Sequence, residues 1–469
     1  MAAPMDPTSA GFLFAENRAQ PMHVGGLQLF RKPEGAGPEF LQELYADMLA
    51  HDEPAPLFLK RPHRSLATAG QWFWTEDDQF DIEYHVRHSA LPKPGRVREL
   101  LELCGRLHST RLALERPLWE MHVIEGLQDG RIAMYSKMHH ALIDGVSSMR
   151  LLQSVLSTDP HETGMAPTWS HEHVDHRPGP DGPQEPEDDA LGLTATALRS
   201  ALALGADAAG LPGALVKTLS RGFRNETSAL SLFAPRTIIN TRITGSRRFA
   251  AQDWPLERLQ SISRASGTTL NDVVLAMSSG AMRTYLDELG ALPDSSLVAM
   301  VPVGLQAKSA HTASASGGNA LGAVMVRLGT DKADPADRLM GIHHSMRDGK
   351  QAMSSMTPSQ ILAMSALGLA PAILAPMLKL EGFTRPPFNL IISNVPGPKE
   401  SLYYNGARME GMYPLSIPLH GMGLNITCTS YAGNIGFGLT GCRRTVPRLQ
   451  RLLTHLDDEL AALEKATGV

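Results

Sequence analysis

Cysteine is scarce in this sequence: 469 residues contain three, Cys104, Cys428 and Cys442. They lie far apart, and no two form a CxxC pair. This spacing argues against a disulfide framework and against a structural zinc site, and it favours a reducing compartment. The N-terminus also lacks the basic-then-apolar order of a signal peptide, so we expect a cytosolic protein.

The sequence has no strong excess of charge of either sign. Its net charge of −5 argues against a dedicated nucleic-acid-binding protein. Hydrophobic residues make up 43% and charged residues 19%, as in a folded globular protein, and 469 residues are enough for two or three domains. The GxSxG motif of serine hydrolases is absent, so we expect no serine nucleophile of that kind.

Long charge-free runs are rare too, and residues 352–378 form one that approaches the ~20 apolar residues of a membrane-spanning helix. Pro371 and Pro376 interrupt this run, which argues against a span. Two interpretations remain open. The run forms either a buried helix pair that lines an apolar cavity or a surface that dips into lipid.

The most informative residues are 139–145, which read HHxxxDG. Strand-like runs over 119–127 and 131–139 form a predicted hairpin that ends at the two histidines, and a helix-like run, 146–156, begins after the Asp-Gly pair. The histidines therefore lie at a strand-to-helix corner. Such a corner is short and rigid, so it can hold a general base in a fixed direction.

This motif resembles the signature of the CoA-dependent acyltransferase superfamily, which includes the chloramphenicol acetyltransferase and peptide-synthetase condensation folds. Further segments resemble motifs of the bacterial wax ester synthase/diacylglycerol acyltransferase family and follow one another in the order expected for it. These segments are Pro21–Gly25, Arg116–Glu120, Gly245–Phe249, Gly317–Asn319 and Ser393–Pro398. Residues 9–13 lack the acidic residue that the family pattern has near that place.

The resemblance implies an α/β fold: two chloramphenicol-acetyltransferase-like domains with mixed sheets and packed helices, and an active-site tunnel at their interface. We place an N-terminal domain at 1–158, a linker and connecting helix at 159–217, and a C-terminal domain at 218–469. Periodicity and turn signals predict elements in both halves. The further helices expected are 40–49, 97–114, 190–217, 271–289 and 447–465, and the further strands are 243–250, 296–305, 321–328, 388–393, 424–429 and 435–439.

The same resemblance implies transfer of a long-chain acyl group from fatty acyl-CoA to the hydroxyl of a fatty alcohol or of diacylglycerol. A thioester is already activated, so the reaction chiefly needs a base for the alcohol, and a neutral imidazole suits that task. In the family the base is the second histidine, here His140. His139 should point into the fold, because adjacent residues at a strand end face opposite sides. Acyl-CoA is a substrate, and we expect no cofactor and no metal.

Four further residues are candidates for support of the corner. Asp144 either caps the following helix, pairs with an arginine as in the superfamily, or takes part in proton transfer. Gly145 is expected because a tight corner excludes a Cβ. Asn271 and Asp272 resemble a second family motif at a helix start, where they either stabilise the oxyanion or cap the helix and cross-link the domains.

The remaining expectations concern partners. CoA carries phosphates, so arginines should lie at its entrance, unless these residues are ordinary solvated surface. The candidates are Arg247, Arg248, Arg443 and Arg444. Insoluble products imply peripheral contact with the inner membrane face or lipid bodies, through 352–378 or 190–217. Two other functions stay open: a condensation-type enzyme that uses carrier-protein thioesters, and a non-catalytic lipid-binding protein, against which an intact HHxxxDG argues.

Overall fold

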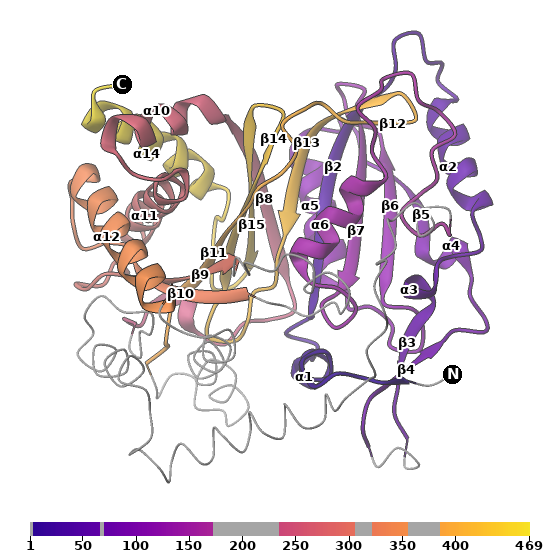
Figure 1. The fold of residues 1–469 in the computed structure, drawn as a ribbon, viewed down its shortest axis with the longest axis horizontal. Helices are drawn as coiled ribbons and strands as arrows, with labels where there is room; N and C mark the ends of the chain where they lie inside the picture. The colour runs from indigo at the N-terminus through magenta and orange to yellow at the C-terminus, as the bar shows by residue number, and fades with distance from the viewer. Residues whose placement is uncertain (1–2, 66–69, 172–233, 305–320, 355–384) are drawn as a thin grey trace.

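The structure, a computed structural model, describes residues 3–65, 70–171, 234–304, 321–354 and 385–469. Within these ranges the chain forms two units side by side, each built on a six-stranded mixed sheet (Figure 1). A small third sheet lies near the N-terminus. It consists of β1 (Ala3–Pro4), β4 (Phe73–Glu76) and β3 (Lys60–His63).

The N-terminal unit contains the predicted hairpin, which the structure confirms: β6 and β7 are antiparallel, and β7 ends at His139. The sheet order is β12-β13-β2-β7-β6-β5, with β5 and β6 parallel. The strands are β2 (His23–Arg31), β5 (Val86–Ala90), β6 (Trp119–Glu125), β7 (Ile132–His139), β12 (Tyr403–Tyr404) and β13 (Ala407–Leu415). The helices are α1 (Pro7–Ala15), α2 (Phe40–Ala50), α3 (Pro56–Leu59), α4 (Ile82–His85), α5 (Val97–Ser109) and α6 (Gly145–Ser154).

The C-terminal unit has the strand order β10-β9-β11-β14-β15-β8, with β11 parallel to both of its neighbours. Among the described residues of this unit, four helices cover the outer face of the sheet and share one continuous apolar core with it (Figure 1). The strands are β8 (Arg247–Pro255), β9 (Val298–Gly304), β10 (Leu321–Arg327), β11 (Leu390–Val395), β14 (Leu424–Tyr431) and β15 (Asn434–Cys442). The helices are α10 (Leu256–Ser266), α11 (Leu270–Glu288), α12 (Pro335–Ser354) and α14 (Arg451–Thr467), with a short η2 (Ile238–Asn240) before β8.

Part of the interface between the units is formed by two strands from late in the chain that join the N-terminal sheet. Residues 403–415, which the sequence assigns to the C-terminal domain, instead form β12 and β13 of the N-terminal sheet. Strand β13 lies close over β15, where a Cβ on Gly438 would come within 2.0 Å of the Pro414 carbonyl oxygen. Glycine is therefore required there by close approach of two backbones. Close to the end of β7, Met22 and Val24 pack with Ile417 and Leu419, which follow β13 in the chain.

Several expectations need correction. The prediction of a solvated linker from residue 159 is wrong for residues 165–170, which are buried. Trp169 in this segment stacks on Trp119 of β6, with ring centroids 5.3 Å apart. The helix predicted over 97–114 ends at Ser109, and the strand predicted over 243–250 begins only at Arg247.

The helix predicted at 190–217 and most of the charge-free run 352–378 lie outside the described residues. In the ranges that are described, no helix is both long and apolar enough to cross a membrane.

Candidate active site at the end of strand β7

Two neighbouring segments hold the backbone of the paired histidines. The amide of His139 donates to the Leu118 carbonyl at 3.0 Å, and the amide of His140 donates to the Met22 carbonyl at 2.8 Å. Leu118 belongs to the motif-like segment 116–120, and Met22 belongs to 21–25. Segments far apart in the sequence therefore meet at this corner, and their backbone fixes where each histidine begins.

His140 is half-buried, and its ring stacks on Phe12 with centroids 4.1 Å apart and planes 22° apart. Its Nδ1 is buried without a hydrogen-bond partner among the described residues. Burial lowers the pKa of His140 to about 4, although its own backbone and the charge of Asp144 act to raise it. The imidazole is therefore neutral near pH 7, which is the state that a general base requires.

His139 is fully buried and points into the fold. Its Nδ1 accepts a hydrogen bond from the Ala141 amide at 3.1 Å, so the proton of the neutral ring lies on Nε2. Nε2 faces Glu16, whose Oε1 is 3.7 Å away. This carboxylate was not anticipated from the sequence, because nothing local connects residue 16 with residue 139.

Asp144 is the N-cap of α6. Its Oδ1 accepts from the Ser147 amide at 2.9 Å, and its Oδ2 accepts from the Ser147 hydroxyl at 2.8 Å. Among the described residues no arginine lies within ion-pair distance of it. Of the three interpretations open for Asp144, the contacts match the helix cap.

The backbone explanation for Gly145 is wrong. Gly145 lacks a positive φ, and a Cβ built on it would meet only Val24 Cγ1, at 4.0 Å. The corner therefore does not require glycine for its geometry or its packing.

Asn271 and Asp272 lie in the first turn of α11 in the C-terminal unit. Asp272 forms a capping box with Thr269, in which each side chain accepts from the other's amide, and its Oδ2 also lies 2.8 Å from Nδ1 of His343 on α12. Asn271 is half-buried and has no side-chain hydrogen bond to another described residue. These contacts are those of a helix start tied to its neighbouring helix, and they do not reach the β7 corner.

The four arginine candidates divide into two groups. Arg247 is 5% exposed and donates to the Ala19 carbonyl at 2.8 Å and to the Thr244 carbonyl, so it links the two units and is wrong as a phosphate contact. Burial lowers its pKa to about 10. Arg248 is half-buried, and Arg443 and Arg444 are exposed.

A buried ionic cluster lies on the α5 side of the same sheet. Lys137 is fully buried, and its Nζ is 3.0 Å from Oε2 of Glu120 and donates to the carbonyls of Leu107 and Thr110 at the end of α5. Burial acts to raise the pKa of Glu120, but His122 and Lys137 together lower it to about 2. Lys137 shares its face of β7 with His139, so fixed charge lies beneath the histidine pair.

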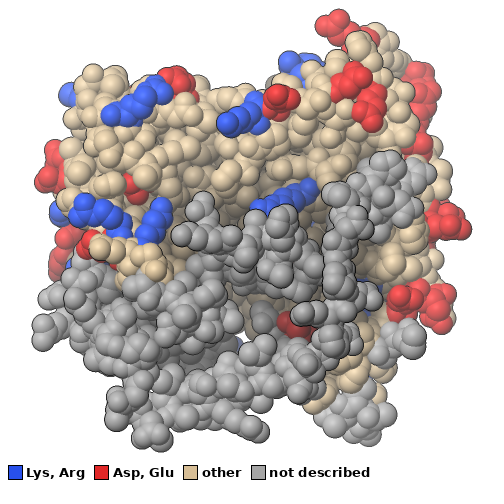
Figure 2. Space-filling model, in the orientation of Figure 1, with Lys and Arg blue, Asp and Glu red and all other residues tan. Residues whose placement is uncertain are grey.

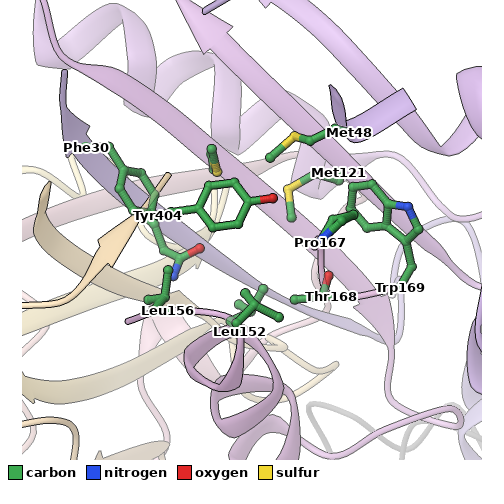
Figure 3. Close-up of a pocket in the computed structure, with 12 residues that line it drawn as sticks. Phe30, Met48, Met121, Leu152, Leu156, Pro167, Thr168, Trp169 and Tyr404 are labelled. Carbon is green, nitrogen blue, oxygen red and sulfur yellow. The ribbon is translucent and has the colours of Figure 1, made fainter. Parts of the chain in front are cut away.

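An apolar pocket lies at the other end of α6, against the opposite face of the sheet (Figure 3). The Tyr404 hydroxyl points into it and is buried without a hydrogen-bond partner in the described part of the chain. Methionines make its wall adaptable. The lining residues are Gln28, Phe30, Met48, Met121, Met134, Leu152, Val155, Leu156, Pro167, Thr168, Trp169 and Tyr404.

Comparison with known proteins gives consistent matches along the chain. The family model described as the wax ester synthase/diacylglycerol acyltransferase catalytic domain matches residues 5–274, and that of the family's C-terminal domain matches 317–464. A probable diacylglycerol O-acyltransferase from Mycobacterium tuberculosis is 47% identical over 465 residues, with 99% of each chain covered.

Two solved structures extend the comparison. The wax ester synthase/diacylglycerol acyltransferase of Marinobacter aquaeolei VT8 is 41% identical, with a TM-score of 0.77 and 100% of both chains covered. The first condensation domain of the CDA synthetase, 15% identical with a TM-score of 0.59 and covered to 96%, shares the fold alone. This chain belongs to the wax ester synthase/diacylglycerol acyltransferase family.

Proposed function

We propose that this O-acyltransferase moves a long-chain fatty acyl group from acyl-CoA to a fatty alcohol or to diacylglycerol, with His140 as general base. Family membership supports the reaction class. The neutral imidazole of His140, fixed at the end of β7 by Met22 and Phe12, is the observation that carries the assignment of the base.

The two ring nitrogens of His140 have different surroundings. Nδ1 is buried without a hydrogen-bond partner among the described residues, and a contact of the ring with the residue's own backbone acts to raise the pKa of His140. We assign Nε2 to proton transfer, because Nδ1 is the ring nitrogen that is buried without a hydrogen-bond partner among the described residues.

In the proposed reaction Nε2 accepts the proton as the alcohol oxygen attacks the thioester carbonyl. The carbon–sulfur bond then breaks, and the CoA thiolate leaves. A thiolate has a conjugate-acid pKa of about 8.5, whereas that of His140 is about 4. The protonated ring therefore returns its proton to the departing sulfur readily. Asp144 supports this cycle by capping α6 and by favouring the protonated ring.

Arg248, Arg443 and Arg444 are the proposed contacts for CoA phosphates. The loop before β8 lies against the N-terminal unit, where a Cβ on Gly245 would come within 2.5 Å of the Arg18 carbonyl. Arg444 donates to the Arg242 carbonyl at 2.6 Å in the same region. Arg18 lies four residues before Met22, whose carbonyl accepts from the His140 amide, so the chain links this basic surface to the corner. It offers guanidinium groups suited to phosphate.

We also propose a cytoplasmic location with peripheral contact to the inner membrane face or lipid bodies, and no nucleic-acid partner. The net charge of −5 supports the latter, and Figure 2 shows acidic side chains gathered along the edge of the N-terminal unit. Insoluble products support the former. Flotation with triacylglycerol-containing liposomes tests it: the purified protein should float, and Leu362→Glu should weaken flotation. A protein that stays wholly in the soluble fraction contradicts the proposal.

The central test follows thiol release from palmitoyl-CoA with hexadecanol or dioleoylglycerol. His140→Ala should lose about 10²–10⁴-fold in turnover while its unfolding transition is unchanged. His344→Ala, which removes an exposed histidine on α12, is the matched control and should keep wild-type turnover. Near-normal turnover by folded His140→Ala protein would overturn the assignment of the base.

The same assay separates the alternatives. A condensation-type enzyme would prefer a carrier-protein thioester to palmitoyl-CoA as acyl donor. A lipid-binding protein would release no thiol from either of these two donors. Replacing palmitoyl-CoA by its N-acetylcysteamine thioester removes the phosphates. Arg443→Ala and Arg444→Ala should raise KM for the CoA ester and leave it unchanged for the truncated ester. An equal effect on both esters contradicts phosphate contact.

A further inference from the structure

Helix α1 turns one face toward residues 139–141. Ser9, Phe12 and Glu16 are spaced by three and four residues, so the helix and the turn that follows it place them in one line. Glu16 extends this line beyond the last helical residue, because its amide still donates to the Phe12 carbonyl at 3.0 Å. Phe14 lies off this line and is 59% exposed.

Each of these three residues contacts a different residue of the corner. The Ser9 hydroxyl donates to the Ala141 carbonyl at 2.8 Å, and the Phe12 ring stacks on His140. Glu16 faces Nε2 of His139 at 3.7 Å. Helix α1 and the turn that follows it therefore contact His140 and both of its chain neighbours.

Glu16 also connects the corner to the strand beside it. Its Oε1 accepts from the Met22 amide at 3.3 Å, and the Met22 carbonyl in turn accepts from the His140 amide. Its Oε2 pairs with Arg111 at 2.8 Å. Burial acts to raise the pKa of Glu16, but His139 and Arg111 lower it overall, so the carboxylate is ionised at neutral pH.

We propose that Phe12 and Glu16 are positioning residues for His140: Phe12 fixes the plane of the ring and excludes water from it, and Glu16 fixes its backbone through His139 and Met22. This inference rests on His140 as the base, and it makes the N-terminal helix part of the active site. Neither residue touches the reacting atoms. Their effect should therefore fall on kcat and on the titration of His140, with little change in KM.

The groups that set the charge around His140 are Asp144 at the start of α6 and His139 at the end of β7. Substituting Phe12 changes neither of them, and it removes only the apolar cover. In Phe12→Ala the ring gains water, so the pKa of His140 should rise from about 4 toward its ordinary 6.5. The pH at which kcat/KM falls on the acid side of its profile should rise together with this pKa.

The experiment uses the full-length chain and two readouts. Ring proton NMR of His140, assigned by comparison with His140→Ala, gives its titration independently of turnover, and pH-dependent thiol release gives kcat and KM. Phe12→Ala should raise the pKa of His140 by at least about one unit and lower kcat by roughly 10–10²-fold. Phe12→Leu should restore part of both. Phe14→Ala is the control on the same helix and should change neither.

Glu16→Gln keeps the size and the acceptor for Met22 but removes the charge that faces His139. It should lower kcat about tenfold with KM unchanged, and Glu16→Asp, which keeps the charge on a shorter side chain, should recover part of the loss.

Unchanged kcat and an unmoved His140 titration in folded Phe12→Ala and Glu16→Gln proteins would overturn the proposal. If His140→Ala retains turnover, the assigned function fails instead, and the NMR titration still reports whether Phe12 shields the ring.

Discussion

The two six-stranded sheets bury polar groups of different kinds. The N-terminal sheet buries ionisable side chains on its strands, among them Lys137, Glu120 and His139. The C-terminal sheet mainly buries uncharged polar side chains, such as Thr427 and Thr440. Its buried Arg247 donates toward the N-terminal unit. Buried charge within the sheets is thus concentrated next to the candidate active site.

This difference has a physical consequence. A buried charge is tolerated only when it is paired or hydrogen-bonded, and breaking the pair leaves the partner desolvated. Substitutions beneath the corner should therefore alter stability and chemistry together. Comparable substitutions in the C-terminal unit should alter stability alone. Pairs of variants, one from each unit, test this separation.

Lys137→Met should give the largest loss of stability. It removes the nearest cation of the buried Glu120 and leaves only Arg87, 3.7 Å away, beside that carboxylate, which costs about 3–5 kcal/mol in the free energy of unfolding. The pKa of Glu120 is lowered from 4.5 to about 2. The pair therefore stabilises the wild type fully at pH values above 4.5, and this stabilisation is lost as the pH falls toward 2. In urea unfolding, the difference in free energy of unfolding between the wild type and Lys137→Met should be smaller at pH 3 than at pH 7. Lys350→Met, an exposed lysine, is the control; an equal difference at both pH values contradicts the pairing.

Arg338→Met is the counterpart in the C-terminal unit, where Arg338 is 2.5 Å from Glu459. Burial outweighs Arg338 and raises the pKa of Glu459, so in the variant this carboxyl can take up a proton instead of remaining charged. The expected cost is smaller, about 1–3 kcal/mol. The difference in free energy of unfolding between the wild type and Arg338→Met should shrink as the pH falls through the pKa of Glu459, which is raised above 4.5. This happens at a higher pH than for Lys137→Met.

Turnover per folded molecule should be unchanged in Arg338→Met and reduced in Lys137→Met. Equal turnover in both variants would remove the functional distinction between the units.

Asp144 tests the corner itself. Asp144→Ala should lose about 1 kcal/mol with its helix cap, and Asp144→Asn only a few tenths, because asparagine also caps well. Asp144 raises the pKa of His140, so its loss should move that pKa below about 4, farther from neutral pH. The pH–rate profile above pH 6 should therefore match the wild type. A shifted profile in a stable Asp144→Asn protein would point to direct coupling in proton transfer.

The fold was most predictable where periodicity is uninterrupted. The β6–β7 hairpin and helix α11 emerge within a few residues of their observed bounds. Strand β2 was missed although it lies beside β7, because Gly25 and Gly26 break the alternation. A Cβ on Gly26 would come within 2.9 Å of Leu152, so the glycine that hides the strand also lets α6 pack on it. Strand β13 was assigned to the wrong unit, because chain order does not record an exchange across the interface between the units.

The site was predictable only where its residues are contiguous. HHxxxDG lies in seven consecutive residues, whereas the Ser9–Ala141 contact joins residues 132 positions apart. No local pattern links Phe12 or Glu16 to that corner. Arg247 and Arg248 look equivalent in sequence, yet strand alternation in β8 buries the first and leaves the second half-buried. Such distinctions depend on tertiary packing.

Gly145 gives the smallest expected effect and the sharpest test of what HHxxxDG requires. Gly145→Ala should be accommodated, since φ is ordinary and the added Cβ has one neighbour at 4.0 Å. Alanine also restricts the unfolded chain, so the free energy of unfolding should stay equal or rise by a few tenths of a kcal/mol. If stability is kept and kcat is kept, glycine is dispensable here. If stability is kept but KM rises, a substrate occupies the open space beside Gly145. Gly145→Ser tests this, because its larger side chain should raise KM further.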